Sequence, residues 1–231
     1  MKILAFDSSA KSASVALIDD NKIIGSFFIN ANLTHSQTLV PMANQLLENT
    51  QTDLNQIDAL AVSVGPGSFT GVRIGVSIVK GLAMTSDKPC IPVSTLEAMA
   101  YNYIQENCTV VAVMDARCNQ VYNANFSINN GVISRLCDDR ALAIDDLYEE
   151  IKTINDKIIL VGDGAELCYN SYKEKYTNIF LASEHIRYQN ATSVAYAALN
   201  KDKISAEQLV PVYLRLPQAQ RELNKRLESQ K

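Results

Sequence analysis

One order of elements occurs twice in this sequence, and it limits the fold more than any other feature. An apolar strand expected at 2–6 runs into Asp7 and is followed by two further strands that end near residue 30. A second apolar strand begins at Thr109, runs into Asp115 and is again followed by two strands separated by a turn. The two copies share little identity, so the repeat is one of architecture. It predicts an α/β fold with two similar lobes.

Helices and further strands follow each of these three-stranded units. Helices are expected at 34–51, from about 70 to 86, within 89–107, at 145–151 and at 191–201, with strands at 57–64, within 89–107 and within 157–164. Thr34 and Gln37 could form a capping box at the first helix, although Pro41 makes its first turn uncertain. We therefore expect a first lobe over 1–107, a second lobe over 108–216, and a charged, helix-prone tail over 217–231.

Composition restricts the class of protein. Of 231 residues, 47% are apolar and 20% are charged, which is typical of a globular protein with a core. The net charge of -4 argues against a surface coated in positive charge for nucleic acid, although a local basic patch is compatible with it. Five cysteines without C-x-x-C spacing favour reduced thiols in the cytoplasm. No apolar run approaches the length of a membrane helix, so we expect no membrane association.

The glycine-rich stretch SVGPGSFTGVRIG, residues 63–75, lies between an expected strand and an expected helix. It lacks the lysine of a Walker loop, and its glycines read G-x-G-x-x-x-G, one residue too long for the dinucleotide fingerprint. Thr70 could cap the helix, and the free N–H groups there could attract an anion. A simple strand-to-helix turn is the alternative.

The helix that follows contains Gly71, Gly75 and Gly81, and each interior glycine costs on the order of 1 kcal/mol relative to alanine. Gly71 and Gly75 are four residues apart and share one face. An apolar stripe lies next to them, formed by Val72, Val76 and Val79. The smooth face could pack tightly inside this chain or could contact another protein, and the sequence leaves both open.

Several motifs together resemble the TsaB family, the dimerisation subunits of the bacterial machinery that makes threonylcarbamoyladenosine in tRNA. They are FDSSAKSASVALI, SVGPGSFTGVRIG followed by VKGLA, PVSTLEAMA, MDARCNQVY, VGDG and PVYLR, in this order from Lys2 to about Arg221. SFTGVRIG is the most specific of them. The resemblance implies the actin/Hsp70/sugar-kinase fold, with mixed sheets in two ribonuclease-H-like lobes.

The resemblance implies a helper and not a catalyst. Such proteins pair with TsaD, which transfers the threonylcarbamoyl group to the adenosine beside the anticodon; TsaE, an ATPase, joins the pair, and tRNA is reached through the complex. We expect a homodimer when the chain is isolated, no cofactor of its own, and ATP or ADP only at the level of the complex. The implied partner interface lies on the first two helices and includes His35, Leu39, Gly71, Val72, Gly75, Val76 and Val79.

Catalytic and metal-binding residues are not expected. TsaD-like proteins carry two histidines in V-N-H-M-E-G-H, and the corresponding positions here hold Thr95 and Met99, which are poor ligands for such a metal. The sequence contains only His35 and His185 as histidines, and it has no G-x-S-x-G elbow for a protease-like reaction.

The alternative function is a stand-alone, nucleotide-dependent, kinase-like enzyme. In the parent fold, Asp7, Ser8 and Ser9 would face a phosphate or Mg²⁺, and Gly162, Asp163 and Gly164 would line the adenosine side. We interpret these six residues as a vestigial nucleotide cleft. The competing interpretation is that Asp7 caps a turn and Asp163 lies in one.

Two charged segments have open roles. Asp115 and Arg117 could form a local ion pair, or they could contact TsaD, TsaE or tRNA. The tail carries Arg221, Lys225 and Arg226 among acidic residues, so it is either a solvated helix or a direct tRNA contact.

Overall fold

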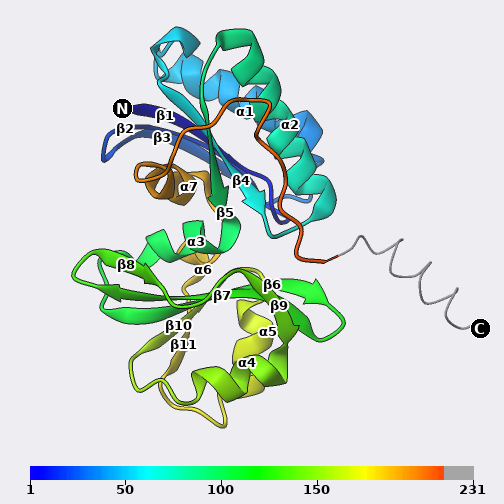
Figure 1. Cartoon of the computed structure of the whole chain (residues 1–231), viewed down its shortest axis with the longest axis vertical. Coiled ribbons are helices and arrows are strands. Elements are labelled where there is room, and N and C mark those ends of the chain that lie inside the picture. Colours follow the sequence, from blue (N-terminus) through cyan, green and yellow to red (C-terminus); the bar gives the residue numbers. More distant parts are fainter. Residues whose placement is uncertain (216–231) are drawn as a thin grey trace, which may run out of the picture.

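The computed structural model describes residues 1–215, which form two lobes stacked along the long axis of the molecule (Figure 1). The first lobe contains a five-stranded sheet of order β3-β2-β1-β4-β5. Its strands are β1 (Lys2–Asp7), β2 (Ala13–Asp19), β3 (Lys22–Ile29), β4 (Ala59–Gly65) and β5 (Cys90–Ser94). β1 pairs antiparallel with β2 and parallel with β4, as a meander followed by a helical crossover requires.

The second lobe repeats this topology in the order β11-β10-β6-β7-β8. Its strands are β6 (Cys108–Arg117), β7 (Gln120–Asn129), β8 (Val132–Arg135), β10 (Ile158–Val161) and β11 (Ile179–Leu181), and β9 (Arg140–Ala143) also pairs with β7. β6 is antiparallel to β7 and parallel to β10. The duplicated three-stranded unit predicted from the sequence is thereby confirmed, with Asp7 and Asp115 near the ends of equivalent strands.

Helices cover both faces of the first sheet. On one face lie α1 (His35–Asn49) and α2 (Phe69–Ser86), and on the other lies α7 (Ala191–Ala198). Side chains of β1 alternate between the two layers: Leu4 and Phe6 pack under α1 and α2, whereas Ile3 and Ala5 pack under α7. The α7 layer is rich in alanine, which lets this short helix approach the sheet closely.

The remaining helices belong to the interface between the lobes and to the second lobe. They are α3 (Thr95–Ala100), α4 (Ile144–Ile151), α5 (Ala165–Tyr172) and α6 (Glu184–Arg187), with short 3-10 turns at Leu54–Gln56 and Tyr101–Tyr103. Side chains of α3 pack with those of β6 and β7 in one hydrophobic cluster, so the two lobes share part of their core. Within residues 1–215, no helix is long and apolar enough to cross a bilayer.

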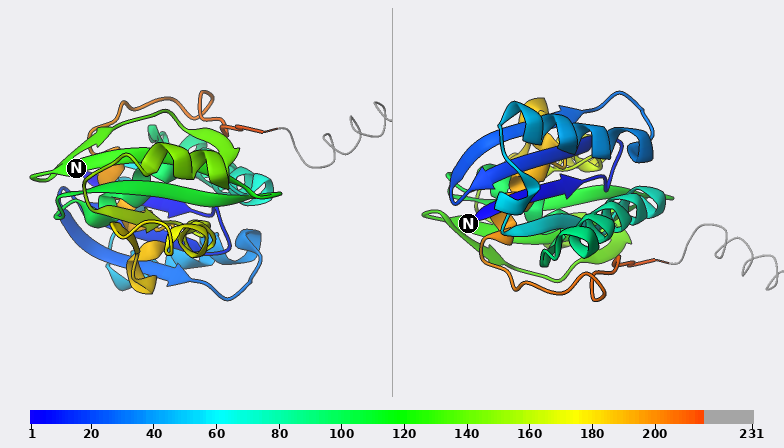
Figure 2. Two further views of the ribbon diagram at one scale, coloured as in Figure 1. Left: turned by 90° about the horizontal axis from the view of Figure 1, so that it is seen from below. Right: turned by 90° about the horizontal axis from the view of Figure 1, so that it is seen from above.

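The chain returns to the first lobe after the second lobe is complete, and this corrects the predicted boundary at residue 216. α7 packs on the first sheet, and the following C-terminal strap, residues 202–215, runs along one side of the molecule (Figure 2). Ile204 forms a bridge with Cys90 at the sheet edge, and the Val212 N–H donates to the Val64 carbonyl at 2.7 Å. The predicted second lobe, 108–216, therefore ends before α7, and the tail prediction for 217–231 lies outside the described residues.

Some local predictions are corrected as well. Thr34 precedes α1 but its side chain makes no capping hydrogen bond, so the capping box with Gln37 is wrong. The helix continues through Pro41. At α2 the cap is Ser68, whose hydroxyl accepts from the Gly71 N–H, and not Thr70. Four short elements, β9, β11, α5 and α6, are not predicted from the sequence.

The return of α7 predicts how fragments behave. A chain of residues 1–107 alone leaves the face that carries Ile3 and Ala5 exposed to water, so we expect it to lack a cooperative urea transition measured by circular dichroism. Joining 107 to 188–215 through a flexible linker is expected to restore the transition. Cooperative unfolding of 1–107 by itself would contradict this assignment of α7.

Candidate functional site

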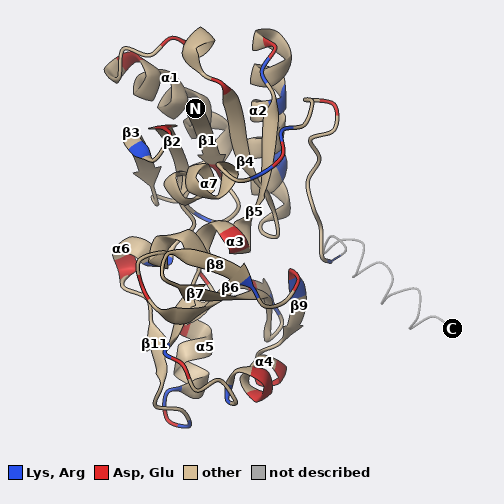
Figure 3. Cartoon of the chain, turned by 60° about the vertical axis from the view of Figure 1, so that its left-hand side comes forward, with Lys and Arg blue, Asp and Glu red and all other residues tan. Residues whose placement is uncertain are grey.

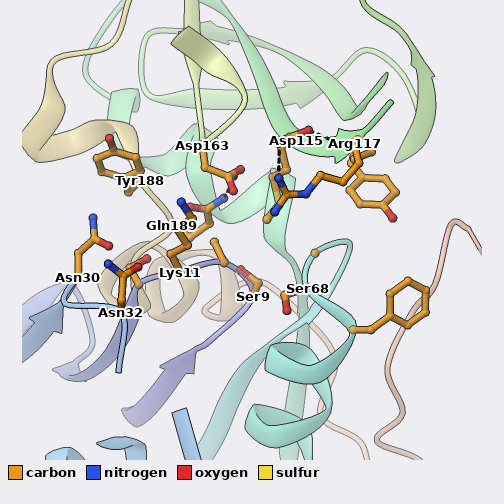
Figure 4. Close-up of a pocket in the computed structure, with 17 residues that line it drawn as sticks. Ser9, Lys11, Asn30, Asn32, Ser68, Asp115, Arg117, Asp163, Tyr188 and Gln189 are labelled. Carbon is orange, nitrogen blue, oxygen red and sulfur yellow. Dashed lines mark hydrogen bonds and ion pairs between the residues drawn. The ribbon is translucent and has the colours of Figure 1, made fainter. Parts of the chain in front are cut away.

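A cleft of about 710 Å³ separates the two lobes. The first lobe contributes the β1–β2 loop and the start of α2, and the second contributes the β6–β7 loop and the turn after β10 (Figure 4). Its lining is polar: Ser9, Lys11, Asn30, Asn32, Ser68, Asp115, Arg117, Asp163, Tyr188 and Gln189 all contribute to it. Such a cleft can hold a polar molecule by hydrogen bonds from both lobes.

Asp7 does not reach this cleft. Its side chain is buried, and its carboxylate accepts hydrogen bonds from the Ser9 N–H at 3.0 Å, the Ser9 hydroxyl at 2.9 Å and the Ser63 hydroxyl. Burial raises the pKa of Asp7 above its usual value, although these hydrogen bonds and the nearby His35 oppose the shift. The expectation that Asp7 faces a phosphate or Mg²⁺ is corrected, and the competing interpretation, that it caps a turn, describes its contacts.

Ser8 is directed away from the cleft as well, onto α2. Its hydroxyl donates to the Gly71 carbonyl at 2.8 Å. A Cβ atom at Gly71 would overlap the Ser8 backbone oxygen, and one at Gly75 would come within 2.5 Å of the Ser8 Oγ. These two glycines are therefore required by packing inside this chain, which was one of the two alternatives left open by the sequence.

The predicted partner interface needs the same correction. The inner sides of the two helices carry these residues, which are all buried: Leu39 on α1, and Gly71, Val72, Gly75, Val76 and Val79 on α2. His35 is half-buried, and its Nε2 forms a hydrogen bond with the Ala10 carbonyl at 2.8 Å. It thereby ties α1 to the β1–β2 loop instead of facing outward.

A different side of α2 is exposed. Ser77, Gly81 and Thr85 recur every four residues and form what we call the α2 ridge. A Cβ at Gly81 would meet nothing within 4 Å, so nothing among the described residues requires a glycine there. Beside the ridge lies a half-buried apolar stripe of Ile74, Ile78 and Leu82. Charged side chains are sparse on α1 and α2 (Figure 3).

In the second lobe, only one of the three predicted cleft residues reaches the cleft with its side chain. Gly162 has φ +102°, and a Cβ there would overlap the Val113 backbone oxygen. A Cβ at Gly164 would lie 3.0 Å from the Asp115 backbone nitrogen in β6, a tight but less severe contact. Asp163 is directed into the cleft, where the Gln189 side-chain amide donates to it at 3.4 Å (Figure 4). Although part of Asp163 is exposed to solvent, desolvation of its carboxyl by the surrounding protein raises its pKa; the hydrogen bond from Gln189 opposes this shift, and the charge of Asp115 adds to it.

Asp115 forms the local ion pair that the sequence analysis offered as one alternative. It pairs with the Arg117 guanidinium at 3.6 Å and accepts from the Arg117 N–H at 2.7 Å. Of the six residues assigned to the nucleotide cleft, Ser9 and Asp163 line it. Lys11, Asn32 and Gln189 were missed, because no spacing rule marks single polar residues in loops.

The positions that correspond to the metal ligands of TsaD-like proteins are inside the molecule. Thr95 and Met99 lie on α3 and are buried against the core shared by the lobes. His185 is in the short helix α6, remote in sequence from His35. Among residues 1–215, no group of three or more histidine, cysteine, aspartate or glutamate side chains could hold a metal ion.

Two lobes of duplicated topology around a central cleft define a protein of the actin/Hsp70/sugar-kinase class. The family model described as TsaD, tRNA N6-adenosine threonylcarbamoyltransferase, matches residues 29–223. Full-length relatives carry the name tRNA threonylcarbamoyladenosine biosynthesis protein TsaB. The protein from Haemophilus influenzae is 36% identical, covering 93% of this chain and 94% of its own, and that from Escherichia coli is 32% identical, covering 93% and 95%. The chain therefore belongs to this family, among its TsaB members.

Solved structures agree with this assignment. A Pseudomonas aeruginosa protein described as similar to the peptidase YeaZ superposes with a TM-score of 0.78 at 28% identity, covering 93% of this chain and 99% of its own. Component A of (R)-2-hydroxyglutaryl-CoA dehydratase from Acidaminococcus fermentans gives a TM-score of 0.55 at 10% identity, covering 87% and 97%. At that identity the second likeness shows the fold alone.

Two glycines of α2, Gly71 and Gly81, make a matched test. We expect Gly71→Ala to lower the free energy of unfolding by about 1–3 kcal/mol, because the added methyl group overlaps the Ser8 backbone. Gly81→Ala is expected to raise it by up to about 1 kcal/mol, because the site is open and alanine favours the helix. Urea titration measures both. Equal effects at the two positions would refute the packing role of Gly71.

The raised pKa of Asp7 predicts how the stability of the fold depends on pH. The pKa of Asp7 is higher in the folded protein than its usual value of 3.8. At a pH between these two pKa values, the folded protein keeps a proton on this carboxyl that the unfolded chain has lost. The contribution of Asp7 to stability therefore falls as pH rises through that window. We expect Asp7→Asn to gain stability relative to the wild type as pH is raised from 4 toward neutrality, measured by urea titration at each pH. A constant difference between the two proteins would contradict a raised pKa.

Proposed function

We propose that this chain is a non-catalytic partner subunit in the formation of threonylcarbamoyladenosine at the tRNA adenosine beside the anticodon. It would bind TsaD and support its activity, with TsaE docking on the pair. The observation that carries the proposal is full-length similarity to TsaB proteins combined with Thr95 and Met99 at the two positions where TsaD-like proteins have histidines. A buried threonine and methionine offer no ligand pair to a metal.

The cleft supports a subunit role more than independent phosphotransfer. Asp7, the residue expected to face a nucleotide phosphate, is buried and hydrogen-bonded to Ser9 and Ser63. Asp115 and Asp163 share the cleft lining with Lys11 and Arg117, and Arg117 is already paired with Asp115, so these four side chains carry no net positive charge for a polyphosphate. In this proposal the chain needs no cofactor of its own, and ATP or ADP acts at the level of the complex.

The α2 ridge is the surface that we assign to pairing. Its small side chains would let a partner helix approach closely, and the neighbouring stripe of Ile74, Ile78 and Leu82 would supply apolar area. Gly81 would then gain, from contact with the partner, a role that it lacks within the described chain. The same ridge could pair two copies of this chain when TsaD is absent.

Depletion is the direct test of function. Nucleoside mass spectrometry of bulk tRNA from depleted cells should show loss of threonylcarbamoyladenosine, and the wild-type gene should restore it. Unchanged modification under verified depletion, in cells without a second copy of the gene, would refute the proposal.

Gly81→Leu tests the pairing surface. The substitution adds bulk to an open position on α2, so we expect the fold to persist while the yield of TsaD in co-purification falls at least tenfold. The matched control is Ser171→Leu, which adds the same side chain to an exposed position on α5 of the second lobe. If Gly81→Leu co-purified with TsaD as well as the control does, the ridge would not be the pairing surface.

A further inference from the structure

Three arginines come from separate segments that adjoin the cleft, and one of them, Arg117, lines it. Arg73 is in α2, Arg117 is in the β6–β7 loop and Arg215 is at the end of the strap; we call them the arginine patch. Two hydrogen bonds join the segments that carry them: the Arg73 Nε donates to the Tyr213 hydroxyl of the strap at 2.6 Å, and the Arg215 Nη1 donates to the carbonyl of Ala116, next to Arg117, at 2.6 Å. The patch thus spans both lobes.

These guanidinium groups are held in place but are mostly not neutralised. Among the described residues, Arg73 and Arg215 have no carboxylate partner, and Arg117 is 75% exposed with its one carboxylate, Asp115, at 3.6 Å. The other described arginines all pair with acidic side chains: Arg135 with Glu97 and Asp139, Arg140 with Glu150, and Arg187 with Glu166. Positive charge that is left unpaired in one place indicates an anionic partner.

An aromatic pair is part of the same surface. The rings of Phe69 and Tyr213 stack with centroids 4.8 Å apart at 15°, and the Arg73 guanidinium lies 5.2 Å from the Tyr213 ring centroid. Tyr213 is 41% exposed, and Phe69 lines the cleft. Exposed rings beside arginine are the surfaces on which unpaired bases stack, whereas an acidic peptide has no need of them.

We propose that the arginine patch and the Phe69–Tyr213 pair bind RNA, contacting phosphates and an unpaired base of the tRNA anticodon arm. The identity of the RNA rests on the proposed function, but the surface itself rests on its contacts and charges. The acidic side chains Asp145, Asp146, Glu149 and Glu150 gather on α4 (Figure 3), which begins beside the β6–β7 loop, where the Ile144 N–H donates to the Asn119 carbonyl at 3.2 Å.

The test measures the affinity of the assembled complex with TsaD for tRNA over a series of salt concentrations. We expect the combined variant Arg73→Gln, Arg117→Gln and Arg215→Gln to weaken binding at least tenfold and to lower the slope of log affinity against log salt by about 2. Arg73→Lys, which keeps the charge, should retain most of the binding. Lys175→Gln is the matched control, because it removes a cation that lies 5.4 Å from the Tyr148 ring on the second lobe.

The outcomes separate the alternatives. The proposal would be overturned if the triple variant bound tRNA with unchanged affinity and salt slope. It would also be overturned if the triple variant still bound tRNA but no longer bound a protein partner, because the patch would then be a protein contact. If the triple variant is less stable in urea, Arg117→Gln alone decides, since this side chain is mostly exposed and should lower the slope by about 0.7–1.

A second titration separates failure of the patch from failure of the proposed function. The isolated chain is titrated with a synthetic anticodon stem–loop. Binding that the variants weaken supports the patch even if pairing with TsaD fails. If the chain pairs with TsaD but its RNA binding does not depend on these arginines, the RNA-binding role of the patch is refuted and the subunit role stands. If neither the wild type nor any variant binds RNA, the RNA-binding role is refuted as well.

Discussion

The contact of the β1–β2 loop with α2 determines much of the rest of this structure. Ser8 lies against the two glycines at 71 and 75, and its hydroxyl donates to the Gly71 carbonyl. The next residues extend the same contact: the Ser68 N–H donates to the Ser9 carbonyl at 2.7 Å, and His35 bonds to Ala10. The loop is therefore fixed to the starts of both helices that cover the first sheet, and Asp7 is buried beneath it.

This arrangement makes the two halves of the cleft unequal, although the lobes share one topology. Asp7 and Asp115 occupy equivalent places, yet Asp7 is buried among hydroxyls and Asp115 lies at the cleft beside an exposed arginine. Water screens the charge of Asp115, whereas the charge of Asp7 carries a desolvation cost that hydrogen bonds offset in part. The two lobes thus share one backbone topology, while residues at equivalent positions in them have different chemical environments.

The sequence revealed the elements of this fold better than it revealed which side of each element matters. The order of the strands and the continuous apolar run of β4 predict the sheets, because such patterns depend only on residues that are close in the sequence. The return of α7 to the first lobe leaves no such trace, since an alanine-rich helix can pack on either sheet. The spacing of Gly71 and Gly75 indicates a shared face, but only the position of Ser8 shows that the face is turned inward. The arginine patch depends on three segments distant in sequence, so no local motif marks it.

The glycines of α2 show why spacing alone is ambiguous. Gly71, Gly75 and Gly81 occur in one helix and each weakens it by a similar amount, yet the first two are compensated inside the chain and the third is not. A helix that covers a sheet must satisfy the sheet on one side and can serve another molecule on the other. Because the inner side of α2 is fully used by the β1–β2 loop and the core, any selective advantage of Gly81 has to come from its outer side. The fold of the first lobe and the pairing of the protein would then depend on opposite faces of the same helix, which can be altered independently.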